Sequence, residues 1–446
     1  GCCETAGTRG SILSCRKGAT VMQIEKVTGE RARDSYYKIQ HPSGLSIYLY
    51  PKESCSTAYA VFGAKYGSID TCFQRSDETK PETVPEGIAH YLEHKLFESE
   101  DGDAFERFAK TGASANAFTS FESTCYLFSC TDQLYESLEI LLDFVQSPHF
   151  TEESVAKEQG IIGQEIKMYD DDPQWRVMFN YLRAMYHTHP IRQDIAGTVE
   201  SIAEITPEYL YRCYRTFYNL GNMALCIAGR LDVERVLEVC ARNLKTSKPV
   251  QVKRVFAPEP ETVVTAKVEQ RLSVSLPLFQ FGFKEAVSGE CRTEREIAAM
   301  EILLETMASD SSPLFQDLLN RGLINETSFS YEYFEGSGYA TVMFGGESRD
   351  PQAVAEAIVA ETERLKRTGI DPAAFTRAKK AIYGENIAAL NSTSNIANAL
   401  ASFTFKGREL FAYLDALAEL QLSDIQQILE RVFDESKTVL SVILPL

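Results

Sequence analysis

The chain has 446 residues, of which 44% are hydrophobic and 24% are charged, and this balance is typical of a globular protein with more than one domain. The formal net charge of −18 argues against nucleic-acid binding, because that function needs a basic face. No apolar run approaches the length of a membrane span, so we expect no membrane-spanning segment.

The N-terminal residues and the cysteines bear on where the protein works. Residues 1–24 carry no apolar core segment typical of a secretory signal, and we expect them to form a disordered extension. Gly1-Cys2-Cys3-Glu4-Thr5 would fit an N-myristoylation pattern if a Met preceded it, but such short matches are common by chance. The 11 cysteines are an odd number, and several lie within apolar strands. This pattern indicates buried reduced thiols and a cytoplasmic location.

From Tyr36 onward, strand and helix signals alternate. A turn signal at His41-Pro42-Ser43-Gly44 joins strands over 36–40 and 45–51. The next predicted elements are a strand over 58–65, a helix from residue 103, a strand over 123–130, helices over 133–145 and 151–169, a strand over 222–229 and a helix over 232–244. Residues 245–265 are rich in Lys, Pro and Thr, so we predict a linker between domains over 25–244 and 266–446.

Residues 90–94 read His-Tyr-Leu-Glu-His and carry the strongest chemical signal in the chain. On a helix, His90 and His94 share one face and Glu93 lies beside them. This is the H-x-x-E-H order of inverzincins, the reverse of the common H-E-x-x-H. With only 6 His in the chain, chance would produce the motif about 0.01 times, so a merely solvated helix face is disfavoured. The motif predicts two metal ligands and a general base.

A hydrolytic zinc site normally has three protein ligands and one open position, so a further ligand is needed. The helix predicted over 151–169 offers Glu158 and Glu165, which are seven residues apart and therefore lie on one face. Acids at this spacing are usually solvated, however. Spacing alone therefore leaves open whether this face binds metal or only contacts water.

The motif and the two acids together resemble the pitrilysin, or insulinase-type, M16 metallopeptidase family. Further segments resemble the family too: Gly112–Thr119, Ser123–Tyr126, His189-Pro190 and Asn219–Gly229. The match runs from about Tyr36 to the C-terminus. The fold that it implies is α+β, with two homologous domains, each a mostly antiparallel sheet packed with helices, that form half of a clamshell chamber.

The resemblance also implies roles for individual residues. It makes His90, His94 and Glu165 the ligands of one Zn²⁺, Glu93 the catalytic base and Glu158 an acid that supports the ligands. It makes a strand of five residues the substrate-binding edge, which holds extended peptides by β-augmentation: Ala115, Asn116, Ala117, Phe118 and Thr119. Phe118 could also line a pocket, although core packing is the more usual role of a Phe.

The two halves of the chain resemble each other at an offset of 210 residues. Residues 104–112 align with 314–322, and the H-x-x-E-H positions fall on Met300, Leu303 and Leu304. Only the first copy is therefore expected to bind metal.

One departure from the family pattern concerns the second domain. The family usually carries an Arg and a Tyr there, in a segment resembling L-R-E-K-x-G-L-x-Y, which help to hold the substrate. Here Leu319 and Asn325 stand at those two positions, while Arg321 and Tyr331 lie nearby but out of register. Either a homodimer uses a variant clamp, or a metal-free M16 paralogue supplies the pair in a heterodimer.

Together these features predict a zinc-dependent endopeptidase that acts on peptides or unfolded polypeptide segments. Two alternatives stay open. One is a maturation protease for a specific peptide precursor, and the other is a non-catalytic M16-like scaffold or peptide-binding subunit. Intact ligand positions favour an enzyme over the second alternative.

Overall fold

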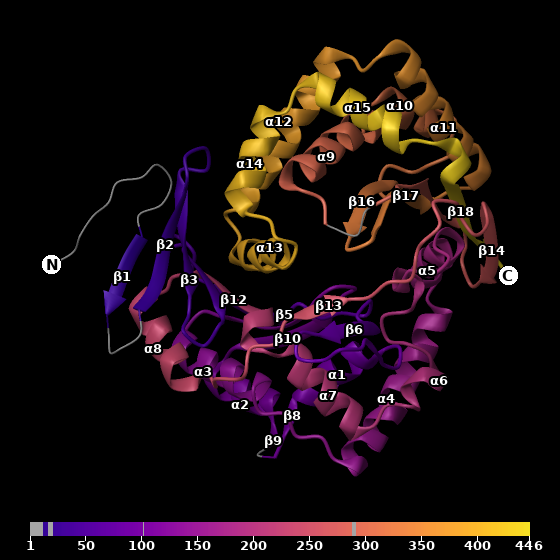
Figure 1. Cartoon of the computed structure of the whole chain (residues 1–446). Helices are drawn as coiled ribbons and strands as arrows, with labels where there is room; N and C mark the ends of the chain where they lie inside the picture. The colour runs from indigo at the N-terminus through magenta and orange to yellow at the C-terminus, as the bar shows by residue number, and fades with distance from the viewer. Residues whose placement is uncertain (1–11, 17–20, 101, 288–290) are drawn as a thin grey trace. The chain divides into compact units, whose positions relative to one another are not determined.

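The computed structural model describes residues 12–16, 21–100, 102–287 and 291–446 (Figure 1). Within them the chain folds into two compact units, and neither unit is one continuous stretch. The first comprises Gly1–Gly163, Asp194–Val255 and Ile387–Phe411, and the second comprises Gln164–Gln193, Phe256–Asn386 and Ala412–Leu446. The sequence predicted two successive domains joined by a linker over 245–265. In the structure, each unit contains segments from both halves of the chain.

Strands occur where the sequence predicted a disordered extension over 1–24. Strand β1 (Ile12–Arg16) pairs antiparallel with β2 (Val21–Gly29), and β2 extends beyond residue 24. The possible myristoylation pattern at Gly1 lies outside the described residues.

The first unit is built on an eight-stranded sheet with the strand order β1-β2-β3-β4-β12-β5-β11-β10. The remaining strands are β3 (Asp34–Gln40), β4 (Ser46–Pro51), β5 (Ala58–Ala64), β10 (Ser114–Thr119), β11 (Thr124–Cys130) and β12 (Met223–Gly229). Strand β12 pairs parallel with β4, and the other neighbouring pairs are antiparallel. Every residue of the central strand β12 is buried, while β10 at the edge alternates between exposed and half-buried side chains.

Helices cover both faces of this sheet. Helix α13 (Thr393–Phe405) packs on β12 and β5 from one side, and α3 (Leu134–Val145) packs on β5 and β11 from the other (Figure 1). The other elements that begin in this unit are β6 (Cys72–Arg75), β7 (Glu82–Thr83), α1 (Ile88–Leu96), β8 (Glu98–Ser99), β9 (Gly102–Asp103), α2 (Ala104–Thr111), α4 (Glu152–Asp171), α6 (Val199–Ile202), α7 (Pro207–Phe217), η2 (Leu220–Asn222), α8 (Val233–Asn243), β13 (Val252–Arg254) and α14 (Leu410–Glu419). The division between the units falls inside α4, after Gly163, although this helix is unbroken.

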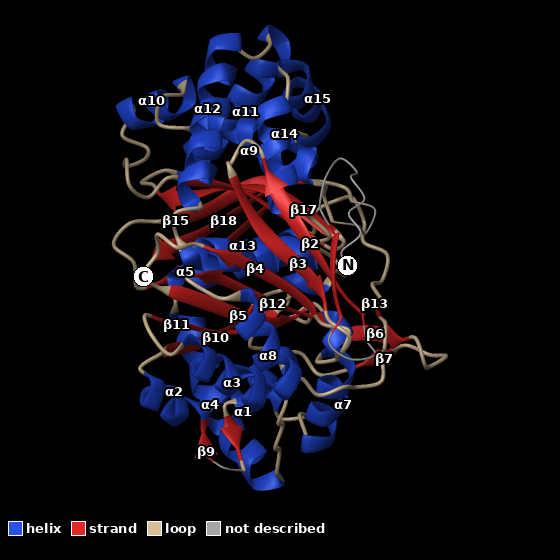
Figure 2. Ribbon diagram, turned by 90° about the vertical axis from the view of Figure 1, so that its left-hand side faces the viewer, coloured by secondary structure: helices blue, strands red, loops and turns tan. Residues whose placement is uncertain are grey.

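The second unit is built on a five-stranded sheet with the order β14-β18-β15-β17-β16. Its strands are β14 (Lys267–Leu272), β15 (Leu278–Lys284), β16 (Ser330–Gly336), β17 (Tyr339–Glu347) and β18 (Thr438–Pro445). Helix α5 (Pro173–Met185) packs on β18 and β15. Figure 2 shows α9 (Glu294–Ala308) and α11 (Pro351–Thr368) together on one side of this sheet. The other elements are η1 (Pro190–Arg192), α10 (Pro313–Asn320), α12 (Pro372–Ala389), α15 (Leu422–Val432) and η3 (Glu435–Lys437).

The predicted duplication is confirmed by the order of elements. Apart from the short strands β8 and β9, which lie between α1 and α2 in the first copy alone, the series α1-α2-β10-β11-α3-α4-α5 recurs as α9-α10-β16-β17-α11-α12-α13. In the second copy, Met300, Leu303 and Leu304 are at most 2% exposed, so the positions that correspond to the metal motif belong to the apolar core of α9. None of the helices in the described ranges combines the length and the apolarity needed to span a bilayer.

Candidate metal centre

Helix α1 carries the H-x-x-E-H motif, and a close backbone approach fixes where the helix begins. Its N-cap is Gly87, with a φ of +86°, a conformation that favours glycine. A Cβ at Gly87 would lie 2.3 Å from the carbonyl oxygen of Ala196, and one at Gly197 would lie 2.5 Å from that of Glu86. Four apolar side chains in and next to this helix are buried: Ile88, Leu92, Leu96 and Phe97. Because these apolar side chains pack in the core, they hold the helix in place, and the face that carries His90 and His94 can form a site.

The structure brings the three predicted ligands together. Ligand atoms of His90, His94 and Glu165 lie within 4.8 Å of one another, and the two imidazole ring centres are 4.5 Å apart. Within α4, the hydroxyl of Tyr169 donates to Oε1 of Glu165 at 2.5 Å. Two imidazoles and one carboxylate form a donor set that zinc accepts, with a fourth position for water or substrate. The residues present therefore fit a zinc ion.

Glu158 contacts one of the predicted ligands, His94, at its ring nitrogen Nδ1. It is 6% exposed, and its Oε1 lies 2.9 Å from Nδ1 of His94. Burial raises the pKa of Glu158, whereas the hydrogen bond with His94 and the positive charges of Lys95 and Lys157 lower it, and the pKa lies below its usual value. An ionised carboxylate only accepts, so Nδ1 of His94 carries the proton and its Nε2 keeps the lone pair that a metal needs.

Glu93, the predicted base, has a hydrogen-bond partner on strand β10. Oγ1 of Thr119 donates to Oε2 of Glu93 at 2.8 Å. The sequence placed Thr119 in the substrate-binding strand and missed this contact. The alternation of β10 puts Ala115, Ala117 and Thr119 on one face, which is the only sequence signal that could have pointed to it.

Strand β10 has the geometry expected of a peptide-binding edge. Among the described strands it pairs with β11 on one side and ends the sheet on the other. The side chain of Asn116 accepts a hydrogen bond from the Ala117 N–H at 2.8 Å. Phe118 is 41% exposed, so the preference for core packing is wrong for this residue.

Known proteins resemble this chain over nearly its whole length. The model of the insulinase family (peptidase family M16) matches residues 80–199, and that of the peptidase M16 inactive domain matches residues 204–382. The uncharacterized zinc protease YmfH of Bacillus subtilis is 40% identical over 94% of this chain and 99% of its own length. The chain belongs to peptidase family M16.

Two further similar proteins match most of this chain. The structure of an M16-like peptidase from Alicyclobacillus acidocaldarius superposes with a TM-score of 0.88 at 35% identity, over 92% of this chain and 98% of that one. A probable mitochondrial-processing peptidase subunit beta from Arabidopsis thaliana is 25% identical over 91% of this chain and 77% of its own length.

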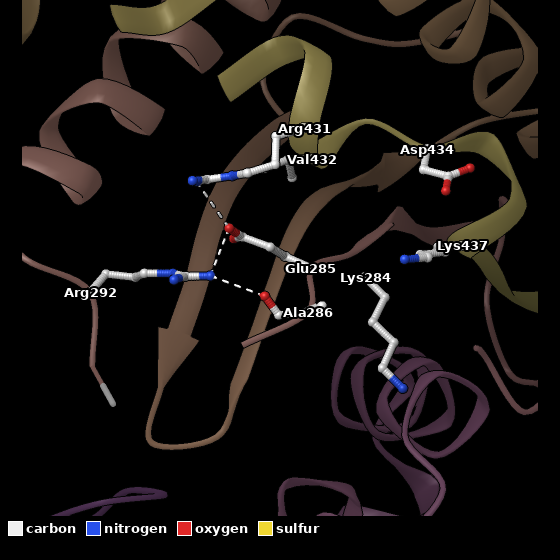
Figure 3. A pocket seen from close by; sticks show the side chains of 8 residues that line it. All are labelled: Lys284, Glu285, Ala286, Arg292, Arg431, Val432, Asp434 and Lys437. Carbon is white, nitrogen blue, oxygen red and sulfur yellow. Dashed lines mark hydrogen bonds and ion pairs between the residues drawn. The ribbon is translucent and has the colours of Figure 1, made fainter. Parts of the chain in front are cut away.

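Apart from the candidate metal site, this M16 protein has a charged pocket in the second unit (Figure 3). It has a volume of about 210 Å³, and its central acid, Glu285, binds Arg292 at 2.7 Å and Arg431 at 3.3 Å. The Lys284 ammonium points away from these groups and donates to Glu259 at 2.7 Å. Arg292 also lies 3.8 Å from Glu296, and Lys437 lies 3.1 Å from Glu261. Each cation that lines this pocket therefore has a carboxylate partner within the protein, and we assign no ligand to the pocket.

Proposed function

We propose that this M16 protein is a zinc-dependent endopeptidase that hydrolyses peptides or unfolded polypeptide segments. The observation that carries the proposal is the convergence of His90, His94 and Glu165, with Glu93 on the same helix as the two histidines. A donor set of two histidines and one glutamate, with a further carboxylate nearby as a base, provides the groups that a hydrolytic zinc enzyme needs.

The residues of this chain divide the work as follows. His90, His94 and Glu165 would hold Zn²⁺, which supplies Lewis-acid activation of a water molecule and of the peptide carbonyl. Glu93 accepts the proton of the attacking water and then delivers it to the leaving amine. Glu158 holds His94 in the tautomer that binds metal. The outer edge of β10 orients an extended peptide through its backbone, which selects unfolded segments over a particular side chain.

The experiment that tests this function is metal removal and return. The zinc-loaded protein is expected to cleave a fluorogenic unstructured peptide, to lose this activity after chelation, and to regain it with one equivalent of Zn²⁺. Thermal unfolding before and after chelation checks that the fold survives. If the loaded protein leaves a broad panel of peptides intact but binds them, the non-catalytic peptide-binding alternative is favoured instead.

The substrate clamp supports a further proposal about assembly. Arg321 pairs with Asp317 on its own helix at 3.0 Å, and Tyr331 donates its hydroxyl to Glu305. The oxygen of the Asn325 side chain accepts from the backbone of Ser328 at 2.7 Å. Because these side chains are engaged within the second unit, we propose that a metal-free M16 paralogue supplies the missing Arg and Tyr, with a homodimer as the alternative. The related Arabidopsis protein is likewise named as a subunit.

An activity assay with and without the paralogue tests the assembly. The protein alone is expected to be a poor peptidase, and an equimolar M16 paralogue that carries the Arg and Tyr is expected to raise kcat/KM by about 10- to 100-fold, because misplacing the scissile bond by an ångström costs about 10²-fold. Full activity alone, unchanged by the paralogue and lost in Arg321→Ala, would establish the homodimer and contradict the heterodimer.

We propose a cytoplasmic location. The support is the set of cysteines that the structure describes as buried thiols without disulfide bonds: Cys125, Cys130, Cys213, Cys226 and Cys240. Burial raises the pKa of Cys125, Cys213 and Cys240 to about 12, which keeps these thiols protonated and unreactive.

A further inference from the structure

The turn between β10 and β11, residues 120–123, is attached to a distant segment of the chain through Arg254. The guanidinium donates to Oε1 of Glu122 at 2.9 Å, to the Glu122 carbonyl oxygen at 3.2 Å, and to Oδ1 of Asp70 at 2.7 Å. The side chain of Arg254 is 11% exposed and that of Asp70 is 1% exposed. These are therefore buried, charge-assisted hydrogen bonds, and water cannot replace them when one partner is removed.

Backbone contacts from residues 67–69 hold the same turn as well. The backbone N–H of Ser68 donates to the Ser120 carbonyl and that of Ile69 to the Phe121 carbonyl, each at 3.1 Å. A Cβ at Gly67 would lie 2.3 Å from the carbonyl carbon of Phe121, so only glycine permits this approach. Both the 67–70 loop and Arg254 therefore fix the turn.

The residue that enters this turn also contacts the proposed base. Thr119 is the last residue of β10, and its hydroxyl donates to Glu93 at 2.8 Å. A glutamate side chain has three rotatable bonds, so its carboxylate needs a partner to stay in one place. One net hydrogen bond changes the ratio of two side-chain positions by a factor of about 5 to 10.

We propose that Thr119 and Arg254 are positioning residues for Glu93, with Arg254 fixing the turn and the turn holding the Thr119 hydroxyl on the Glu93 carboxylate. The inference rests on the proposed peptidase function, since it takes Glu93 as the base. It assigns the Thr119 hydroxyl to Glu93 and leaves the β10 backbone for the peptide. Arg254 belongs to β13, inside the segment 245–265. Through the turn and Thr119, it therefore also links that segment to Glu93 on helix α1.

The test compares Thr119→Val, Thr119→Ser, Arg254→Met and the Val/Met double variant. Thr119→Val is expected to lower kcat about 10-fold with KM and zinc content unchanged, and Thr119→Ser to restore most of the activity. Arg254→Met is expected to lower kcat too, and the double variant to be no worse than Thr119→Val. Arg212→Met is the matched control, because Arg212 also bridges two carboxylates, Glu78 and Glu82, but does not contact the turn.

Structural readouts keep this inference separate from the peptidase proposal. If Arg254→Met does not fold, Glu122→Met removes the carboxylate acceptor on the turn, keeps the weaker contact to the backbone carbonyl at 122, and leaves Arg254 paired with Asp70. Crystal structures of the zinc-loaded variants should show the Glu93 carboxylate displaced in Thr119→Val and the turn displaced when the Arg254–Glu122 contact is lost. Wild-type kcat in Thr119→Val, or fully multiplicative losses in the double variant, overturns the inference. If the wild type shows no Glu93-dependent cleavage, an undisplaced Glu93 carboxylate in both variants overturns it as well.

Discussion

Replacing Glu93 with Gln is expected to abolish peptide cleavage while zinc stays bound. The amide of Gln has nearly the same shape as the carboxylate, and it can still accept the hydrogen bond from Thr119. It cannot take a proton from water, however, so the step that generates the nucleophile loses its base. We expect kcat to fall by about 10³-fold or more, with one equivalent of zinc retained and an unchanged unfolding temperature.

The matched control for this variant is Glu98→Gln, on the segment that follows the same helix. Because Lys95 is buried and its charge acts on Glu158, Glu98→Gln reports only on this ion pair, and a second control is Glu106→Gln on α2. Glu106 is exposed and takes no part in the proposed site, so its replacement should leave kcat within about twofold, as is usual for a surface acid. Near wild-type turnover in Glu93→Gln would show that another group serves as the base, and elemental analysis would exclude metal loss as the cause of an inactive variant.

The first half of the metal site could be found from sequence because a helix dictates its geometry. His90 and His94 are four residues apart, so one helical turn places both rings on one face whatever the rest of the fold does. The second half could not be assigned by spacing. Glu158 and Glu165 share a face of α4, and only the tertiary structure shows that Glu165 joins the histidine cluster while Glu158 contacts His94 from behind.

The arrangement of the fold was only partly predictable for a similar reason. Apolar runs bounded by turn signals predicted β4, β5 and β12, because a strand that is buried on both faces is apolar along its length. The pattern of an amphipathic helix does not reveal which sheet the helix covers. The sequence therefore could not predict that α5 packs on the sheet of the second unit and α13 on the sheet of the first. The contact from Arg254 to Glu122 joins residues 132 positions apart, and no local pattern encodes it.

The roles of the two glutamates on α4 predict different consequences for metal binding. Glu165→Gln is expected to lose most of the bound zinc, because a neutral amide is a weak ligand and the remaining pair of histidines leaves the site incomplete. His94→Ala should behave alike. Glu158→Gln should keep zinc but weaken its affinity by about 10- to 100-fold, since it changes only the group that orients His94.

Competition with a chromophoric zinc chelator measures all three affinities under one condition. Glu153→Gln is the matched control, because Glu153 is an exposed acid in the first turn of the same helix and should leave the affinity unchanged. Stoichiometric, tightly held zinc in both Glu165→Gln and His94→Ala would remove the site as assigned. A total loss in Glu158→Gln with normal binding in Glu165→Gln would reverse the two roles, because it would make the carboxylate behind His94 the third ligand.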